Sequence, residues 1–190
     1  MDNFIMFKLK LNLNEIHSPD IVMQKIREDN FIKTLHTEIL GDINKLVGQI
    51  HEEFGNGCLI LRHEFIDIEQ RYGLWTISNI YLNTAYSEGM NLSPFEFVSV
   101  KQQQGKLEKA SCIISEFSGC KQALNGAYLV NPYNIEEISK QIDFAITQKM
   151  HFKSDRMGIQ FSFINKHSTL KWAQGFLTLL KKARKSQADS

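Results

Sequence analysis

Apolar residues follow two different periods along the chain, and this change predicts strands and helices in turn. Residues Phe7 to Leu13 alternate apolar and polar side chains, which predicts a strand with one exposed face. Helical spacing of apolar residues covers Pro19 to Phe54, and Gly55-Asn56-Gly57 ends this region. The pattern of apolar residues predicts further strands at Cys58–Leu61, Ile80–Leu82, Ser111–Ser115 and Ala127–Val130. It predicts helices at Ile66–Ser78, Ser93–Gln104 and Asn134–Lys149, a helical turn at Gln122–Leu124, and one or two helices over Asp155–Lys185.

This order of elements predicts an α/β fold. Strands that alternate with helices through short connections form a parallel sheet with helices on both faces, as in Rossmann-like domains. A length of 190 residues suits one domain, so we expect a single domain over residues 1–190. We expect the basic sequence from Lys181 onward to be a loose tail.

Composition narrows the possible partners. Lys and Arg total 22 against 21 Asp and Glu, so no overall field favours nucleic acid or an acidic membrane. Cys58, Cys112 and Cys120 are odd in number and lack the spacing of metal ligands, and we expect no metal and no cofactor. The sequence shows no secretory signal pattern and no run near the ~20 apolar residues of a membrane span. We therefore expect a cytoplasmic protein without a nucleic-acid or membrane partner.

The loop after Ile80–Leu82 is the candidate site, because open α/β sheets bind ligands beyond the carboxyl ends of their strands. Gly89 allows a tight backbone turn there, and amides near a helix start suit a phosphate. Glu88 in the loop and Glu96 one turn into the helix place two carboxylates in position to face one crevice. The candidate ligand-binding residues are Glu88, Gly89, Met90, Asn91, Leu92 and Glu96.

Two local features have a structural alternative. Ser93-Pro94-Phe95-Glu96 has the pattern of a capping box, in which Glu96 would bond the helix start instead of a ligand. Asn134 follows a predicted strand and is well placed to cap the next helix. Both interpretations of Glu96 stay open at this point.

Several ordered motifs resemble trehalose-6-phosphate synthases, the glycosyltransferase family 20. They are Glu88-Gly89-Met90-Asn91-Leu92, Ser115-Glu116-Phe117-Ser118-Gly119, Leu129-Val130-Asn131-Pro132-Tyr133-Asn134, and the segments Ile43–Ile50 and His167–Leu177. The match covers about residues 40–180. It resembles the C-terminal, nucleotide-sugar half of retaining glycosyltransferases with two Rossmann-like domains. The family usually has Asp at the position of Glu88.

The resemblance implies a function and roles for the site residues. The family transfers glucose from a nucleotide sugar such as UDP-glucose to glucose 6-phosphate, without an obligatory metal. By resemblance, Glu96 would bind the ribose, Glu88 the sugar hydroxyls, and the amides of Met90 to Leu92 the phosphates. Phe65 is a candidate to stack on the nucleotide base, although Phe is a core residue by default.

The start of the sequence departs from the family pattern. Nothing in Met1 to Asn12 resembles the family segment Val-Asp-Arg-Leu-Asp-Tyr-x-Lys-Gly, whose Arg and Lys bind the diphosphate. Phe7–Leu13 corresponds instead to the second strand, so the central first strand is expected to be missing. We expect a fragment or degenerate relative whose sheet is completed by another polypeptide or copy. Alternatively, Phe7–Leu13 pairs directly with Ile80–Leu82. The rival functional hypothesis is a non-catalytic structural or interaction protein within a larger complex.

Overall fold

The computed structural model describes residues 5–7, 40–56, 59–61 and 66–188, with the side chains of 5–7 and 185–188 excepted. The chain divides into two compact units, one of residues 11–65 and the other of Met1–Lys10 with Ile66–Ser190. The single domain therefore stays a prediction. In the first unit a helix covers residues 40–54, and it ends where predicted, at Gly55. Gly55 has a φ of +90° and donates its N–H to the His51 carbonyl over 2.9 Å.

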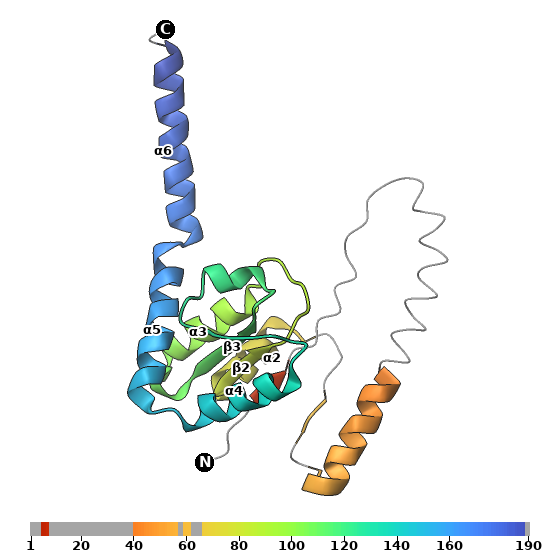
Figure 1. The fold of residues 1–190 in the computed structure, drawn as a ribbon. Coiled ribbons are helices and arrows are strands. Elements are labelled where there is room, and N and C mark those ends of the chain that lie inside the picture. Colours follow the sequence, from red (N-terminus) through yellow and green to blue (C-terminus); the bar gives the residue numbers. More distant parts are fainter. Residues whose placement is uncertain (1–4, 8–39, 57–58, 62–65, 189–190) are drawn as a thin grey trace, which may run out of the picture. The chain divides into compact units, whose positions relative to one another are not determined.

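The second unit is built on a four-stranded parallel sheet, ordered β1-β2-β3-β4 (Figure 1). The strands are β1 (Ile5–Phe7), β2 (Ile80–Asn83), β3 (Ser111–Ser115) and β4 (Tyr128–Val130). Those at 80–82, 111–115 and 128–130 confirm the predictions from periodicity. β1 begins two residues before the predicted N-terminal strand, of which residues 8–13 lie outside the described part.

β1 pairs directly with β2, in register from Ile5 opposite Ile80 to Phe7 opposite Leu82. The expected gap beside β2 is therefore absent from the described residues. Of Phe7–Leu13, for which direct pairing with Ile80–Leu82 was the alternative, only Phe7 is described, and it does pair with Leu82. The strand predicted at Cys58–Leu61 is wrong over residues 59–61, which have no regular structure, and Ile60 is 75% exposed. β1 and β3 pair with the two edges of β2, so residues 59–61 cannot pair with β2.

Four helices surround the sheet: α2 (Ile68–Ile77), α3 (Ser93–Gln103), α4 (Ile135–Thr147) and α5 (Met150–Lys166). A further helix, α6 (Thr169–Ala188), follows α5, and nearly all of its described side chains are exposed. Short 3₁₀ turns cover Leu107–Lys109 and Gly119–Gln122, the latter earlier than the predicted turn at 122–124. The terminal helices start five residues earlier than predicted. α6 continues to Ala188, so residues 181–188 of the tail that we expected to be loose are helical.

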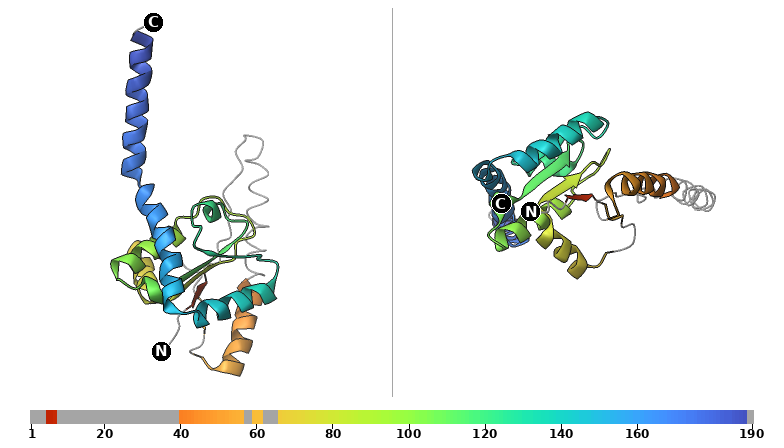
Figure 2. Two further views of the ribbon diagram at one scale, coloured as in Figure 1. Left: turned by 60° about the vertical axis from the view of Figure 1, so that its left-hand side comes forward. Right: turned by 90° about the horizontal axis from the view of Figure 1, so that it is seen from below.

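The two faces of the sheet bury separate cores. Tyr81, Cys112 and Ile114 pack with Trp75 of α2, Phe97 and Val98 of α3, and Met157 of α5. The alternate residues of the same strands, Ile80, Leu82 and Ile113, pack with Ala145 and its neighbours on α4. Helices cover both faces (Figure 2), which confirms the predicted Rossmann-like α/β architecture.

Gly126, just before β4, lets the chain pass against the backbone of α5. A Cβ atom at this position would lie 2.0 Å from the Arg156 carbonyl oxygen, whereas one at Gly158 within α5 would meet nothing within 4 Å. We expect Gly126→Ala to destabilise the protein by about 2 kcal/mol or more, because backbone must move on both sides. Gly158→Ala is the matched control, and its higher helix propensity should leave stability equal or raise it by about 0.5–1 kcal/mol. Urea midpoints that fall equally for both variants would contradict this account.

Candidate functional site

The loops after β2 and β3 contact each other at the carboxyl edge of the sheet. Glu88 and Ser118 form an isolated parallel bridge, and the Gly119 N–H donates to the Glu88 carbonyl over 2.9 Å. A Cβ atom on Gly119 would lie 3.1 Å from the carbonyl carbon and oxygen of Gly89. The two motifs singled out from the sequence, around Glu88 and around Glu116, are therefore parts of one surface.

The glycine that this contact requires is Gly119 and not Gly89. Gly89 has no left-handed φ, and a Cβ atom placed on it meets nothing within 4 Å. The prediction that Gly89 provides a special backbone turn is therefore wrong. The loops after β2 and β3 approach closely because Gly119, on the loop after β3, has no side chain.

Glu88 is the centre of a hydrogen-bond network. Its Oε2 accepts from Asn83 Nδ2 at 2.6 Å and from Asn91 Nδ2 at 3.0 Å, and Ser118 Oγ lies at 3.5 Å. Asn83 is buried at the end of β2, and its own Oδ1 accepts the Ala85 N–H at 2.9 Å. No hydrogen bond from a described residue reaches Glu88 Oε1, which leaves this oxygen free to accept from a ligand.

Asn91 links the loop to the core and to the start of α3. Its Oδ1 accepts the Ser93 N–H at 3.0 Å, and its Nδ2 lies 3.4 Å from the Tyr81 hydroxyl. Burial raises the pKa of Tyr81 far above its ordinary value, so this hydroxyl stays neutral. Asn91 is thus held on two sides, while Met90 and Leu92 beside it are 62% and 63% exposed.

α3 begins without the predicted capping box. Its N-cap is Leu92, with a helical φ of −85° and ψ of −14°, and no side chain caps it. Ser93 is instead the first helical residue and is buried. The capping interpretation of Glu96 is therefore wrong, because the Ser93 N–H donates to Asn91 Oδ1, two residues earlier, and not to Glu96.

Glu96 forms contacts that the sequence did not reveal. Arg71 Nε lies 2.9 Å from Glu96 Oε2, and Arg71 Nη2 donates to Oε1 at 3.1 Å. The indole N–H of Trp75 also donates to Oε2, at 3.3 Å. Arg71 and Trp75 stand four residues apart on α2, so they share one helix face. That spacing is the only sequence signal for the pair, and it does not identify the partner.

The two carboxylates occupy separate networks. Glu88 contacts β2 and the two loops, whereas Glu96 contacts α2, and among described residues they share no hydrogen-bond partner. Glu96 also lines a groove of about 690 Å³ together with Leu92, Tyr72 and Thr76. The structure thus joins two predicted site residues, Leu92 and Glu96, in one groove.

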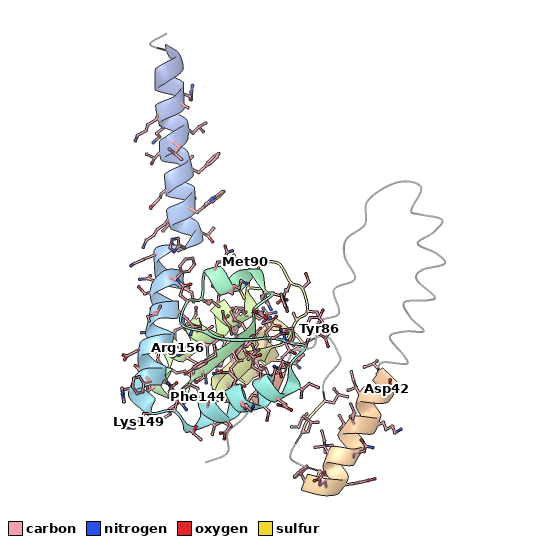
Figure 3. All side chains as sticks on the ribbon, viewed as in Figure 1. Asp42, Tyr86, Met90, Phe144, Lys149 and Arg156 are labelled. Carbon is pink, nitrogen blue, oxygen red and sulfur yellow. The ribbon has the colours of Figure 1, made fainter. Side chains whose placement is uncertain are left out.

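An exposed aromatic cluster stands beside the Glu88 loop. The rings of Tyr86 and Tyr133 are 4.6 Å apart between centroids, and Phe117 lies edge-on to Tyr133 at 6.0 Å. These residues follow β2, β4 and β3 respectively, so they share the carboxyl edge with Met90 (Figure 3 labels Tyr86 and Met90). Phe65, the predicted base-stacking residue, lies outside the described residues.

The described residues contain neither a group of metal ligands nor a membrane-spanning helix. Over residues 40–56, 59–61 and 66–188, no three His, Cys, Asp or Glu side chains group as metal ligands would. None of the helices in the described part of the chain has the length and apolar character needed to cross a membrane.

A parallel sheet with helices on both faces and polar loops at its carboxyl edge defines the class of Rossmann-like, ligand-binding α/β domains. The sequence matches glycosyltransferase family 20 over residues 12–182, a wider range than the motifs suggested. The chain belongs to glycosyltransferase family 20.

Curated relatives include trehalose-phosphate synthases of yeast and plants. The chain is 30% identical over 151 residues to the UDP-forming alpha,alpha-trehalose-phosphate synthase 56 kDa subunit of Saccharomyces cerevisiae, covering 78% of this chain and 30% of that protein. It is 37% identical over 137 residues to the probable UDP-forming synthase 4 of Arabidopsis thaliana, covering 70% and 17%. The chain therefore spans less than a third of these relatives.

Solved structures share the fold. A trehalose-6-phosphate protein from E. coli bound with UDP-2-fluoro glucose has a TM-score of 0.67 at 23% identity, over 77% of this chain and 33% of that one. The UDP-forming synthase of Burkholderia vietnamiensis has a TM-score of 0.68 at 18% identity, over 82% and 34%. The N-terminal domain of Candida albicans trehalose-6-phosphate phosphatase has a TM-score of 0.66 at 19% identity, over 77% and 31%.

Removal of the Glu88 carboxylate should destabilise the site. Glu88→Ala leaves the amide groups of Asn83 and Asn91 without their shared acceptor, at a cost of about 1–3 kcal/mol. Glu116→Ala, which removes a carboxylate from the neighbouring loop, is the control and should change stability by less than about 0.5 kcal/mol. Chemical denaturation of both variants measures the difference, and equal effects would show that the network does not stabilise the fold.

Proposed function

We propose that this chain is the donor-binding part of a retaining glucosyltransferase that resembles trehalose-6-phosphate synthase. The donor would be a nucleotide sugar such as UDP-glucose, and the acceptor glucose 6-phosphate. The observation that carries the proposal is the Glu88 network, which holds one carboxylate oxygen with Asn83 and Asn91 and leaves the other available at the ligand-binding edge. Family membership and the UDP-forming relatives support the substrate class.

Each candidate residue has a role in this proposal. Glu88 Oε1 accepts from a sugar hydroxyl, and the segment Gly89 to Leu92 lies along the phosphates and the edge of the sugar. Glu96 accepts from the ribose, and Phe65 is the candidate for stacking on the base. No metal ligand or cofactor is part of the proposal. Orientation of the donor and electrostatic stabilisation of the leaving diphosphate would then provide the rate.

The proposal requires a partner for the complete reaction. The chain spans less than a third of its curated relatives, so the acceptor site would come from another polypeptide or a further segment. Within the described residues β1 and β4 are the edge strands, and a partner that completes the sheet would pair at the outer edge of β1. The cytoplasmic location stays a prediction.

Donor binding is tested directly with UDP-glucose and isothermal calorimetry. Glu88→Gln replaces the carboxylate with a neutral amide. The amide oxygen can still accept from the two asparagines, and the NH₂ group, which is a donor, then takes the place of the free acceptor oxygen. We expect about tenfold weaker UDP-glucose binding for Glu88→Gln, since one hydrogen bond to a charged group is lost. Glu116→Gln is the matched control and should bind as the wild type does. Failure of the wild-type chain to bind UDP-glucose would contradict the proposal.

A second candidate function is a non-catalytic structural or interaction protein within a larger complex. The engagement of Glu96 by Arg71 and Trp75 favours it, because the carboxylate assigned to the ribose is already bound within the chain. The fold also occurs in a domain of a protein named as a phosphatase, so the fold alone does not determine the activity.

The chain by itself should have no transferase activity. A coupled assay of UDP release, with UDP-glucose and glucose 6-phosphate, should give turnover at the background rate, because in this proposal the acceptor site lies on another polypeptide or a further segment. Turnover above background that disappears in Glu88→Gln would contradict this prediction. It would also exclude the non-catalytic alternative.

A further inference from the structure

Both carboxylate oxygens of Glu96 already have partners within the chain. A carboxylate offers about four positions for hydrogen bonds, and a ribose presents two neighbouring hydroxyl donors. Arg71 Nε lies 2.9 Å from Oε2 and Arg71 Nη2 donates to Oε1 at 3.1 Å, while the Trp75 indole donates to Oε2 at 3.3 Å. The guanidinium therefore lies against both oxygens, and a ribose whose two hydroxyls approach both of them must displace it.

Arg71 is the donor that can leave. Trp75 is 1% exposed, and its ring packs edge-on against Tyr81 and Phe97 with centroids 5.4 and 6.0 Å away. The Arg71 side chain is 30% exposed, and the contacts found for its guanidinium among described residues are those to Glu96. A long side chain at the surface can change rotamer without disturbing the core.

A ligand can reach Glu96 from solvent. Its side chain is 24% exposed and lines the groove of about 690 Å³ that also includes Leu92, at the start of α3, and Tyr72 of α2. A ribose that enters this groove meets Arg71 and Trp75 already bound to the carboxylate. The ribose and the guanidinium therefore compete for the same two oxygens.

We propose that Arg71 sets the affinity of this chain for its nucleotide-sugar donor, by competing with the donor ribose for the Glu96 carboxylate. The inference rests on the proposed function. Arg71 acts through Glu96 and is not itself a ligand of the donor. Binding of the donor releases Arg71 from α3, while Trp75 stays in place and keeps Glu96 oriented.

Arg71→Met tests the competition, because it removes the guanidinium and keeps a long, helix-compatible side chain. A partly exposed ion pair changes a binding constant by a factor of about 1.5–5 when it must be broken. Because Arg71 contacts both carboxylate oxygens, we expect a factor of about 3–10. We therefore expect UDP to bind Arg71→Met about 3–10 times more tightly than the wild type, measured by calorimetry. Arg71→Lys, which keeps the charge with a single-point contact, should fall between the two.

Two controls separate competition from a general change in stability. Lys140→Met removes a charge from the exposed Lys140–Glu136 pair on α4, the helix on the opposite face of the sheet, and should leave UDP affinity unchanged. The 2′,3′-dideoxy analogue of UDP lacks the hydroxyls that need Glu96. Its affinity should be the same for the wild type and Arg71→Met, whereas a purely structural effect would change both ligands alike.

The outcomes distinguish this inference from the proposed function. Unchanged or weaker UDP binding by Arg71→Met, or an equal gain for the dideoxy analogue, would overturn the role of Arg71 while donor binding by the wild type stands. Binding by Arg71→Met alone supports the competition in its strongest form. If neither the wild type nor Arg71→Met binds UDP-glucose, both the donor site and the competition are wrong.

Discussion

The parallel pairing of β2 with β3 is the constraint on which the rest of the second unit depends. It runs in register from Ile80 opposite Ser111 to Asn83 opposite Ile114, so both strands deliver their following loops to one edge. Only there can Glu88 bridge to Ser118 and the Gly119 N–H reach the Glu88 carbonyl. The same strands also divide the core, because their alternate residues face α2, α3 and α5 on one side and α4 on the other.

The spacing of apolar residues correctly predicted the elements that depend on residues close together in the sequence. Ser111–Ser115 is a continuous buried run and forms a strand with the predicted bounds, while Asn134 caps α4 by accepting the Glu137 N–H at 3.1 Å. Residues 59–61 have the same apolar character but pair with no described strand, and a local pattern does not report strand pairing. The capping-box prediction was wrong for a similar reason, since Asn91 Oδ1, and not the Glu96 side chain, accepts the Ser93 N–H.

The site was predictable to the extent that its residues lie close together in sequence. Glu88 and Asn91 are three residues apart, and the loop that holds them follows a clear strand. Arg71 and Glu96 are 25 residues apart on two helices, and they meet only because α2 and α3 pack against the same face of the sheet. Their contact depends on how each helix is rotated about its axis. Apolar spacing predicts which broad face of a helix is buried, and this is too coarse to identify the residues that meet across two helices.

The Glu88 network has a consequence for how this surface can change over evolution. Asn83, Glu88, Asn91 and Ser118 come from a strand end, its loop and the next loop, and three of them converge on one oxygen atom of the fourth. Groups that share a partner in this way do not contribute independently, so the effect of any substitution depends on which residues stand at the other three positions. A shorter acid at position 88 would therefore change the contacts of Asn83, Asn91 and Ser118 together. The network couples the effects of substitutions at these four positions, although they span 36 residues of the chain.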